Sequence, residues 1–276
     1  MREIDLHVHT TASDGTDAPA EVVRRAAMLG LRAVAITDHD NVGGYAGAFS
    51  AAHDCGMEVV PGIEVSTKYG VAVHILGYYV ENLVPLLADI VNDRDRRNEK
   101  VAALMASDGL PVSYGMMKKR FGDVIGRPHF GELLIEFGLA RDMDDAFARF
   151  VGKGMKYYVP RTIIDLDSSV EAIVASGAVP VLAHPFQYKK NDSELRELIE
   201  RCMDHGLRGL ECRYSGYSPE QSAYLECLAE EYGLLKTGGS DYHGSHKPHI
   251  ALGSGIDGNL EVPYEWLERL KEAAGQ

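Results

Sequence analysis

The chain has 276 residues, of which 45% are hydrophobic and 25% charged, and a formal net charge of −13. This length is enough for one large core, or for one core with an inserted subdomain. The composition is that of a globular protein, and no apolar run is long enough to cross a bilayer. The negative charge argues against duplex nucleic acid as a partner, whereas a small anion could still bind where cations gather in a cleft.

The cysteines and the first residues favour a cytoplasmic protein without membrane association. The four cysteines form no CxxC pair and show no regular spacing, so neither a zinc ribbon nor a disulfide framework is indicated. Residues 1–7 include three charged side chains where a secretory signal needs a basic segment followed by an apolar core. Export is therefore not expected.

Strands alternate with helices in the first part of the chain. Residues 3–8 alternate apolar and polar side chains, as a half-buried strand does. The helix expected next has Pro19 in its first turn and ends at Gly30. The expected strands cover residues 3–8, 32–37, 58–63 and 71–79, and the expected helices cover residues 19–29 and 45–54.

This alternation stops after residue 84 and resumes near residue 160. Residues 86–105 are typical of a long charged helix, and residues 109–159 hold short helical pieces with no convincing buried strand. The later helices are expected over residues 166–176, 193–205 and 219–232, and the later strands over residues 179–183, 208–213 and 234–238. We therefore predict a barrel domain of residues 1–84 and 160–276, and a helical insertion of residues 85–159 that caps the active site.

Seven strands alternating with helices predict an α/β fold. Such an order implies a parallel sheet with helices outside it, and seven or eight units can close into a barrel. The carboxyl ends of the strands then meet at one mouth, where catalytic groups gather. Side chains that follow different strands are therefore expected to converge.

Histidines and carboxylates lie at or near these strand ends. His7 and His9 are two residues apart, so both imidazoles project from one face of an extended chain. The candidate ligands found in this way are His7, His9, His39, Glu64, His74, His184, Asp241 and His243. Imidazole favours zinc, iron or manganese, and a carboxylate can bridge two ions. Because the set exceeds one tetrahedral site, we expect two or three divalent ions.

Each histidine taken alone has a plainer explanation. A single histidine is more often a polar surface residue or a hydrogen-bonded core residue than a metal ligand. The joint pattern favours ligands, because six of the 11 histidines lie at the ends of expected strands or within them. His53 and His205 lie near helix ends and are expected to be structural. Asp38 and Asp40 flank His39 and are expected to support it rather than to bind a metal.

Seven short motifs resemble those of the polymerase and histidinol phosphatase (PHP) superfamily, in the family's order along nearly the whole chain. They are DLHVHT at residues 5–10, SDG at 13–15, TDHD at 37–40, GIE at 62–64, HILGY at 74–78, AHP at 183–185 and GSDYH at 239–243. The resemblance implies a distorted (β/α)7 TIM-like barrel, in agreement with the seven expected strands, and a metal-dependent phosphoesterase.

The resemblance also implies how the ligands share the ions. It adds Asp14, a position at which some relatives have histidine. It assigns His7, His9, Glu64 and Asp241 to the first ion, Asp14, His39 and His243 to the second, and Glu64, His74 and His184 to the third.

The expected insertion looks like that of the nucleotide phosphatase and oligoribonuclease branch, through RRN at residues 96–98 and GRPH at residues 126–129. The residues expected to grip substrate oxygens are Arg97, Asn98, Arg127 and His129. Arginine forks match phosphate geometry. The alternatives are a solvated helix face for Arg97, a loop ion pair for Arg127 and a loop hydrogen bond for His129.

The cluster predicts hydrolysis of a small phosphate ester. Two adjacent divalent ions lower the pKa of a bridging water towards about 7, and the bridging hydroxide would attack phosphorus in line. Glu64, Asp241 and His243 are the expected catalytic residues, and whether His243 protonates the leaving group stays open. The preferred substrate is a nucleotide 3′,5′-bisphosphate, an AMP-like nucleotide or a short oligoribonucleotide, and the alternative is a sugar phosphate or cyclic phosphodiester. The other classes of function are a metal-dependent amidohydrolase and a noncatalytic PHP module.

Overall fold

The computed structural model describes residues 3–80, 82–122, 125–160 and 164–276. The chain divides into two compact units, and each is described by itself. The first unit comprises Met1–Ala88 with Ile163–Gln276, and the second comprises Asp89–Thr162. Among the helices of these described ranges, none is both long and apolar enough to cross a membrane.

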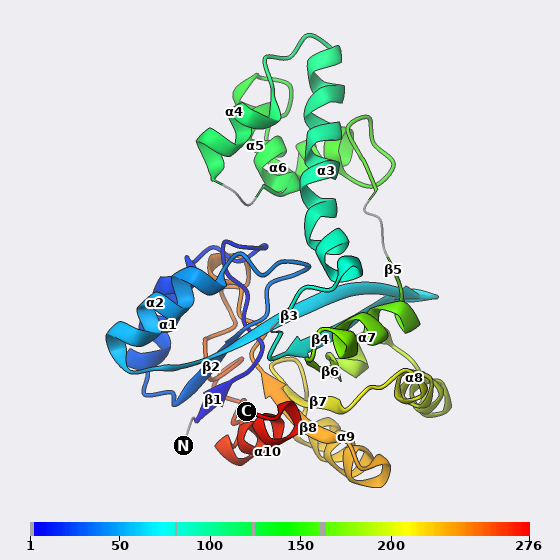
Figure 1. The fold of residues 1–276 in the computed structure, drawn as a ribbon. Coiled ribbons are helices and arrows are strands. Elements are labelled where there is room, and N and C mark those ends of the chain that lie inside the picture. The colour runs from blue at the N-terminus through cyan, green and yellow to red at the C-terminus, as the bar shows by residue number, and fades with distance from the viewer. Residues whose placement is uncertain (1–2, 81, 123–124, 161–163) are drawn as a thin grey trace. The chain divides into compact units, whose positions relative to one another are not determined.

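An eight-stranded sheet forms the centre of the first unit (Figure 1). Its path is β1 (Ile4–Asp5), β2 (Ala33–Ile36), β3 (Glu58–Tyr69), β4 (Val71–Tyr78), β6 (Val179–Leu182), β7 (Gly209–Tyr214) and β8 (Leu235–Gly239), and β5 (Ile164–Asp165) pairs with β3. The sheet nearly closes, because Val8 forms a parallel bridge with Tyr242 and the Leu6 amide donates to the Gly238 carbonyl at 3.1 Å. The predicted distorted barrel is confirmed.

Strand β4 departs from the parallel arrangement that the sequence predicted. β3 and β4 form an antiparallel hairpin in which Tyr69 faces Val71, and β4 is also antiparallel to β6. The prediction of an all-parallel sheet was wrong here. A parallel neighbour needs a crossover of a dozen or more residues, whereas Gly70, with φ of 71°, is the only residue between these strands.

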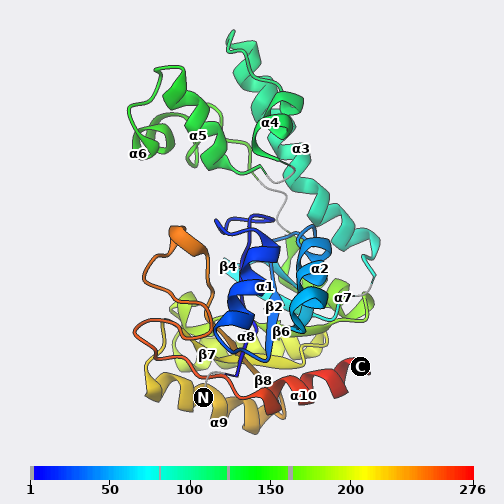
Figure 2. The same ribbon diagram turned by 90° about the vertical axis from the view of Figure 1, so that its left-hand side faces the viewer.

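Helices lie outside the sheet (Figure 1). They are α1 (Pro19–Met28), α2 (Tyr45–Cys55), α7 (Leu166–Ala175), α8 (Asp192–Asp204), α9 (Pro219–Tyr232) and α10 (Tyr264–Ala274). Helices α1 and α2 pack side by side over β2 and β3 (Figure 2). The short strand β5 and the helix α10 were not predicted.

The barrel core lies between these helices and the sheet. Val22, Val23 and Ala26 from α1 are fully buried and pack with Val34 and Ile36 from β2 in one apolar cluster. This packing holds α1 against β2, the strand that precedes His39 in the chain.

The second unit is helical and has an apolar core of its own. It contains most of α3 (Pro85–Ser107), then α4 (Tyr114–Phe121), α5 (Arg127–Glu136), α6 (Met143–Ala146) and a π-helical turn, η1 (Phe147–Val151). Met105, Met117 and Phe130 are fully buried in its core. Within the described residues of this unit no strand occurs, as the sequence predicted.

Candidate metal centre

Glu64, in β3, lies at the centre of the histidine cluster and is 1% exposed. Its Oε2 atom lies 3.3 Å from His7 Nε2, 3.1 Å from His9 Nε2 and 3.0 Å from His39 Nδ1. These three histidines follow β1 and β2, the two strands before β3. One carboxylate oxygen therefore faces imidazoles from two neighbouring strand ends.

The other Glu64 oxygen faces the opposite side of the cluster. Its Oε1 atom lies 2.8 Å from Nδ1 of His74, in β4, and 2.9 Å from Nε2 of His184, which follows β6. The hairpin of β3 and β4 brings His74 into the cluster, although β4 runs against the direction of a parallel barrel. Glu64 thus has the placement of a carboxylate that can bridge ions.

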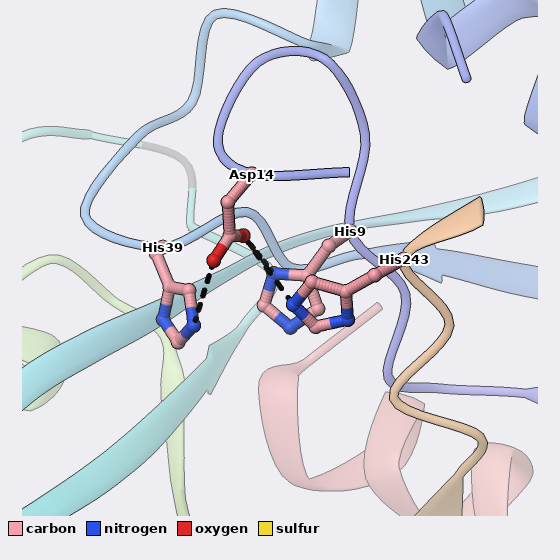
Figure 3. Close-up of side chains that lie close together, drawn as sticks. All are labelled: His9, Asp14, His39 and His243. Carbon is pink, nitrogen blue, oxygen red and sulfur yellow. Dashed lines mark ion pairs between the residues drawn. The ribbon is translucent and has the colours of Figure 1, made fainter. Parts of the chain in front are cut away.

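Asp14 lies at the outer edge of the cluster (Figure 3). Its Oδ1 atom is 3.3 Å from His243 Nε2 and 3.7 Å from His9 Nδ1, and its Oδ2 atom is 3.9 Å from His39 Nε2. The Asp14 side chain is 53% exposed, whereas His9 is fully buried. Asp14 therefore marks the side of the cluster that is open to solvent.

Asp241 lies two residues after the end of β8, and its two carboxylate oxygens have different neighbours. Oδ1 lies 3.3 Å from His9 Nε2 and 3.7 Å from His7 Nε2. Oδ2 accepts hydrogen bonds from the Tyr214 hydroxyl at 2.8 Å and from Lys247 Nζ at 2.6 Å. These two donors leave Oδ1 as the oxygen that faces the imidazoles.

All nine side chains expected as ligands meet in this cluster. They fall into four groups within which the potential ligand atoms lie no more than 4.8 Å apart: His9, Asp14, His39 and His243; His7, Glu64 and His184; His7, His9 and Asp241; and His39, Glu64 and His74. The groups share members, as expected of a site that can hold more than one ion.

The charges in the cluster fit divalent cations. Burial would raise the pKa of Glu64, but the charges of His39 and His74 hold it well below its usual value. Burial would lower the pKa of His9, but its hydrogen bond with Asp241 and the nearby Glu64 raise it to about 9. His7 Nε2 and His9 Nε2 are only 3.1 Å apart. Ionised carboxylates and converging ring nitrogens are donors that zinc, iron and manganese prefer.

Glu211, in β7, supports the cluster from behind and was missed in the sequence. It is fully buried, its Oε1 atom lies 2.8 Å from His7 Nδ1, and its Oε2 atom accepts the His184 backbone N–H at 2.7 Å. A carboxylate on Nδ1 fixes the imidazole so that Nε2 is directed at the metal side. No motif marks Glu211, and the available signal was a carboxylate between two apolar residues, Leu210 and Cys212, of an expected strand.

Asp38 and Asp40 accept hydrogen bonds from groups of neighbouring segments. Asp38 is 1% exposed and accepts hydrogen bonds from the Thr10 amide at 2.8 Å and the Ser13 hydroxyl at 2.5 Å. Asp40 Oδ1 accepts from the Ser66 amide at 2.7 Å. Asp38 thereby shapes the loop that carries Asp14.

Two residues of the cluster have left-handed backbone conformations. His184 has φ of 27° and Asp241 has φ of 57°. Such conformations cost a non-glycine residue about 1–3 kcal/mol and concentrate at functional sites. In both, the turn directly after a strand directs the side chain towards Glu64 or the neighbouring imidazoles.

The four residues expected to bind substrate lie in or near the core of the second unit. Asn98 is fully buried and donates to the Ile125 carbonyl at 2.5 Å, and its Oδ1 atom accepts from Arg97 Nη2 at 2.9 Å. His129 Nδ1 accepts the Gly126 amide at 2.9 Å, which is the loop hydrogen bond considered as its alternative. The Arg127 guanidinium lies 5.7 Å from the Phe147 ring.

Fold and site together define a metal-binding α/β-barrel protein. The chain belongs to the PHP domain family, whose match covers residues 5–206. Family membership and the donor set indicate that the protein binds divalent metal ions.

Several proteins are similar to this chain over most of its length and most of their own. A 5′-3′ exoribonuclease of Haemophilus influenzae is 30% identical over 247 residues, covering 88% of this chain and 90% of the relative. A 3′,5′-nucleoside bisphosphate phosphatase of Chromobacterium violaceum is 32% identical over 250 residues, covering 88% of each chain. A crystal structure described as a metal-dependent phosphoesterase of Bifidobacterium adolescentis has a TM-score of 0.77 and 30% identity, covering 98% of this chain and 96% of the other.

Proposed function

We propose that this chain is a metal-dependent phosphoesterase that hydrolyses a small nucleotide phosphate ester, either a nucleoside 3′,5′-bisphosphate or a short oligoribonucleotide. The observation that carries the proposal is the contact of both Glu64 oxygens with five imidazoles, which lie in or after four different strands. The full-length similarity to an exoribonuclease and a bisphosphate phosphatase supports the substrate class.

The proposed centre holds two or three ions of manganese, zinc or iron. The ligands are those named from the sequence, with His7, His9, Glu64 and Asp241 at the first ion, Asp14, His39 and His243 at the second, and Glu64, His74 and His184 at the third. Bound divalent ions supply a water of lowered pKa, about 7, as the nucleophile, and positive charge beside the phosphoryl oxygens.

The side chains of the cluster define the face that substrate approaches. His7, His9 and Glu64 are nearly or fully buried, whereas His74 and Asp14 are 25% and 53% exposed. The buried members hold the ions and exclude water from behind. The proposed reaction therefore takes place at the exposed side, where His243 lies beside Asp14 and is the candidate donor of a proton to the leaving group.

The insertion is proposed to bind the anionic part of the substrate. Residues 85–159 carry 12 lysines and arginines against 11 acidic residues, whereas the whole chain has a net charge of −13. This contrast supports a substrate-binding role for residues 85–159. Arg127 is the strongest of the four candidates, since the other three, Arg97, Asn98 and His129, already make hydrogen bonds within the unit.

The protein is proposed to be located in the cytoplasm. All four cysteines are free, two of them buried and two exposed. Thiols are kept in this state in reducing compartments.

Activity on p-nitrophenyl phosphate and on an amide analogue tests the reaction class after reconstitution with manganese. We expect hydrolysis of the phosphate ester and loss of turnover in Asp241→Asn and His9→Ala. Arg127→Ala should chiefly raise KM, and Arg149→Ala in the same unit serves as its control. Turnover at the wild-type rate in both Asp241→Asn and His9→Ala would reject the assigned centre.

A further inference from the structure

A row of aromatic rings leads away from the metal centre along the ends of β6 and β7. The Tyr214 ring lies 5.6 Å from the His184 ring and 5.1 Å from the Tyr217 ring. Phe186 follows at 5.4 Å from Tyr217, and Tyr224 at 6.0 Å from Phe186. The row therefore connects a candidate metal ligand with the first turns of α9.

A pocket of about 500 Å³ lies at the far end of this row. The 3₁₀ turn η2 (Pro185–Tyr188) and the first turns of α8 and α9 form it. Its lining includes Phe186, Lys190, Leu195, Gln221 and Tyr224. These segments follow the carboxyl ends of β6 and β7, and the metal centre lies at the same end of these strands. Its volume lies within the range of about 300–1,000 Å³ for small-molecule sites.

Two of the aromatic side chains are placed to present ring surface in this pocket. Phe186 and Tyr224 are half-buried, whereas Tyr217 is buried behind Phe186. The Phe186 amide donates to the Tyr217 hydroxyl at 3.3 Å, which fixes the turn that carries the Phe186 ring. Supported rings with part of their surface accessible are suited to stacking against a planar ligand.

The charged lining of the pocket comprises two cationic side chains, Lys190 and Arg196, and two carboxylates, Asp192 and Glu220. Asp192 pairs with Arg196 Nε at 3.2 Å, and Glu220 accepts the Ser218 hydroxyl at 2.7 Å, so neighbours hold both carboxylates. Lys190 Nζ lies 5.6 Å from the Tyr69 ring. Within the described part of the chain, no carboxylate forms a salt bridge with Lys190, which leaves its charge available to a phosphate.

We propose that this pocket binds the base of a nucleotide adjacent to the scissile phosphate, with Lys190 beside its phosphate group. The substrate is then a single-stranded oligoribonucleotide rather than a mononucleotide. This inference rests on the proposed function and extends it by a second subsite. Every base has a π-face, and one stacked base strengthens binding by about 5- to 150-fold.

Binding of a fluorescein-labelled tetraribonucleotide to the full chain, measured by anisotropy in EDTA, tests the pocket without requiring turnover. Tyr224→Leu should weaken binding by about 5- to 150-fold, whereas Tyr224→Phe, which keeps the ring and loses only the hydroxyl, should bind like wild type. Tyr232→Leu, at the other end of α9, is the control. Equal affinity of wild type and Tyr224→Leu, or absence of binding by wild type, would overturn the subsite.

A kinetic comparison separates this inference from the proposed function. With the manganese form, Tyr224→Leu should raise KM for the tetraribonucleotide more than KM for p-nitrophenyl phosphate. Lys190→Gln should lower the slope of log Kd against log salt concentration by about 0.7, as expected for one lost phosphate contact to a single strand. Failure of wild type to hydrolyse any phosphate ester would reject the proposed function. If wild type hydrolyses both substrates and Tyr224→Leu has the same ratio of the two KM values as wild type, the subsite is rejected and the proposed function is not.

Discussion

Replacing Glu211 by Gln tests whether a side chain outside the ligand set organises the metal centre. The Glu211 carboxylate accepts from two buried donors, His7 Nδ1 at 2.8 Å and the His184 backbone N–H at 2.7 Å. Gln has nearly the same shape but only one acceptor oxygen. In Glu211→Gln, one of the two donors therefore loses its partner.

The loss of one acceptor oxygen sets the expected loss of stability in Glu211→Gln. One buried donor left without an acceptor costs about 1–3 kcal/mol, so the free energy of unfolding should fall by that amount. Since His7 and His184 belong to one ligand group with Glu64, metal affinity should also fall. Loss of a hydrogen-bond partner of a ligating histidine typically costs about 10- to 100-fold in affinity.

Urea unfolding of the metal-free protein and competition with a chelator measure the two effects separately. Glu226→Gln is the matched control. Glu226, on α9, lies 2.8 Å from Arg213 Nε and does not belong to the cluster. The reasoning would be refuted if Glu211→Gln bound metal as tightly as the control variant.

Three further predictions concern the stability of the insertion, the turn of the β3–β4 hairpin and the protonation of His9. Asn98→Ala should reduce stability by about 1–3 kcal/mol in urea unfolding, because it leaves the buried Ile125 carbonyl without its donor; wild-type stability would contradict this role. Gly70→Ala should lower the free energy of unfolding by about 1–2 kcal/mol, because the φ of 71° is left-handed. A Cβ at this position meets no atom within 4 Å, so the backbone conformation alone accounts for the loss. An unchanged thermal unfolding temperature would contradict this prediction. The raised pKa of His9, about 9, keeps it protonated near neutral pH without metal. Titration calorimetry at pH 7.5 in two buffers should therefore show proton release on metal binding that fades above the His9 pKa, and a buffer-independent enthalpy at pH 7.5 would contradict it.

The alternation of strands and helices was sufficient to predict the barrel, but not the direction of every strand. A fully buried strand has the same apolar pattern in a parallel and an antiparallel pair. The single residue Gly70 between two expected strands was the available sign of a hairpin. Helix α10 was also detectable, since Trp266, Leu267 and Leu270 form a buried face after Pro263.

The candidate site was more predictable than its surroundings. Two-residue spacing at strand ends, as in His7 and His9, marks side chains that share a face and meet at a barrel mouth. Glu211 and Tyr214 have no such signal, because their roles depend on contacts with His7 and Asp241, which are distant in sequence. Pairings of that kind arise only when the sheet closes.

Anomalous diffraction from crystals of the full chain grown with zinc or manganese tests the central claim most directly. The account predicts at least two anomalous peaks among the nine side chains, with one or more at bonding distance from Glu64, about 2.0–2.2 Å for a zinc–oxygen bond. Peaks confined to surface sites, with none at bonding distance from Glu64, would contradict it.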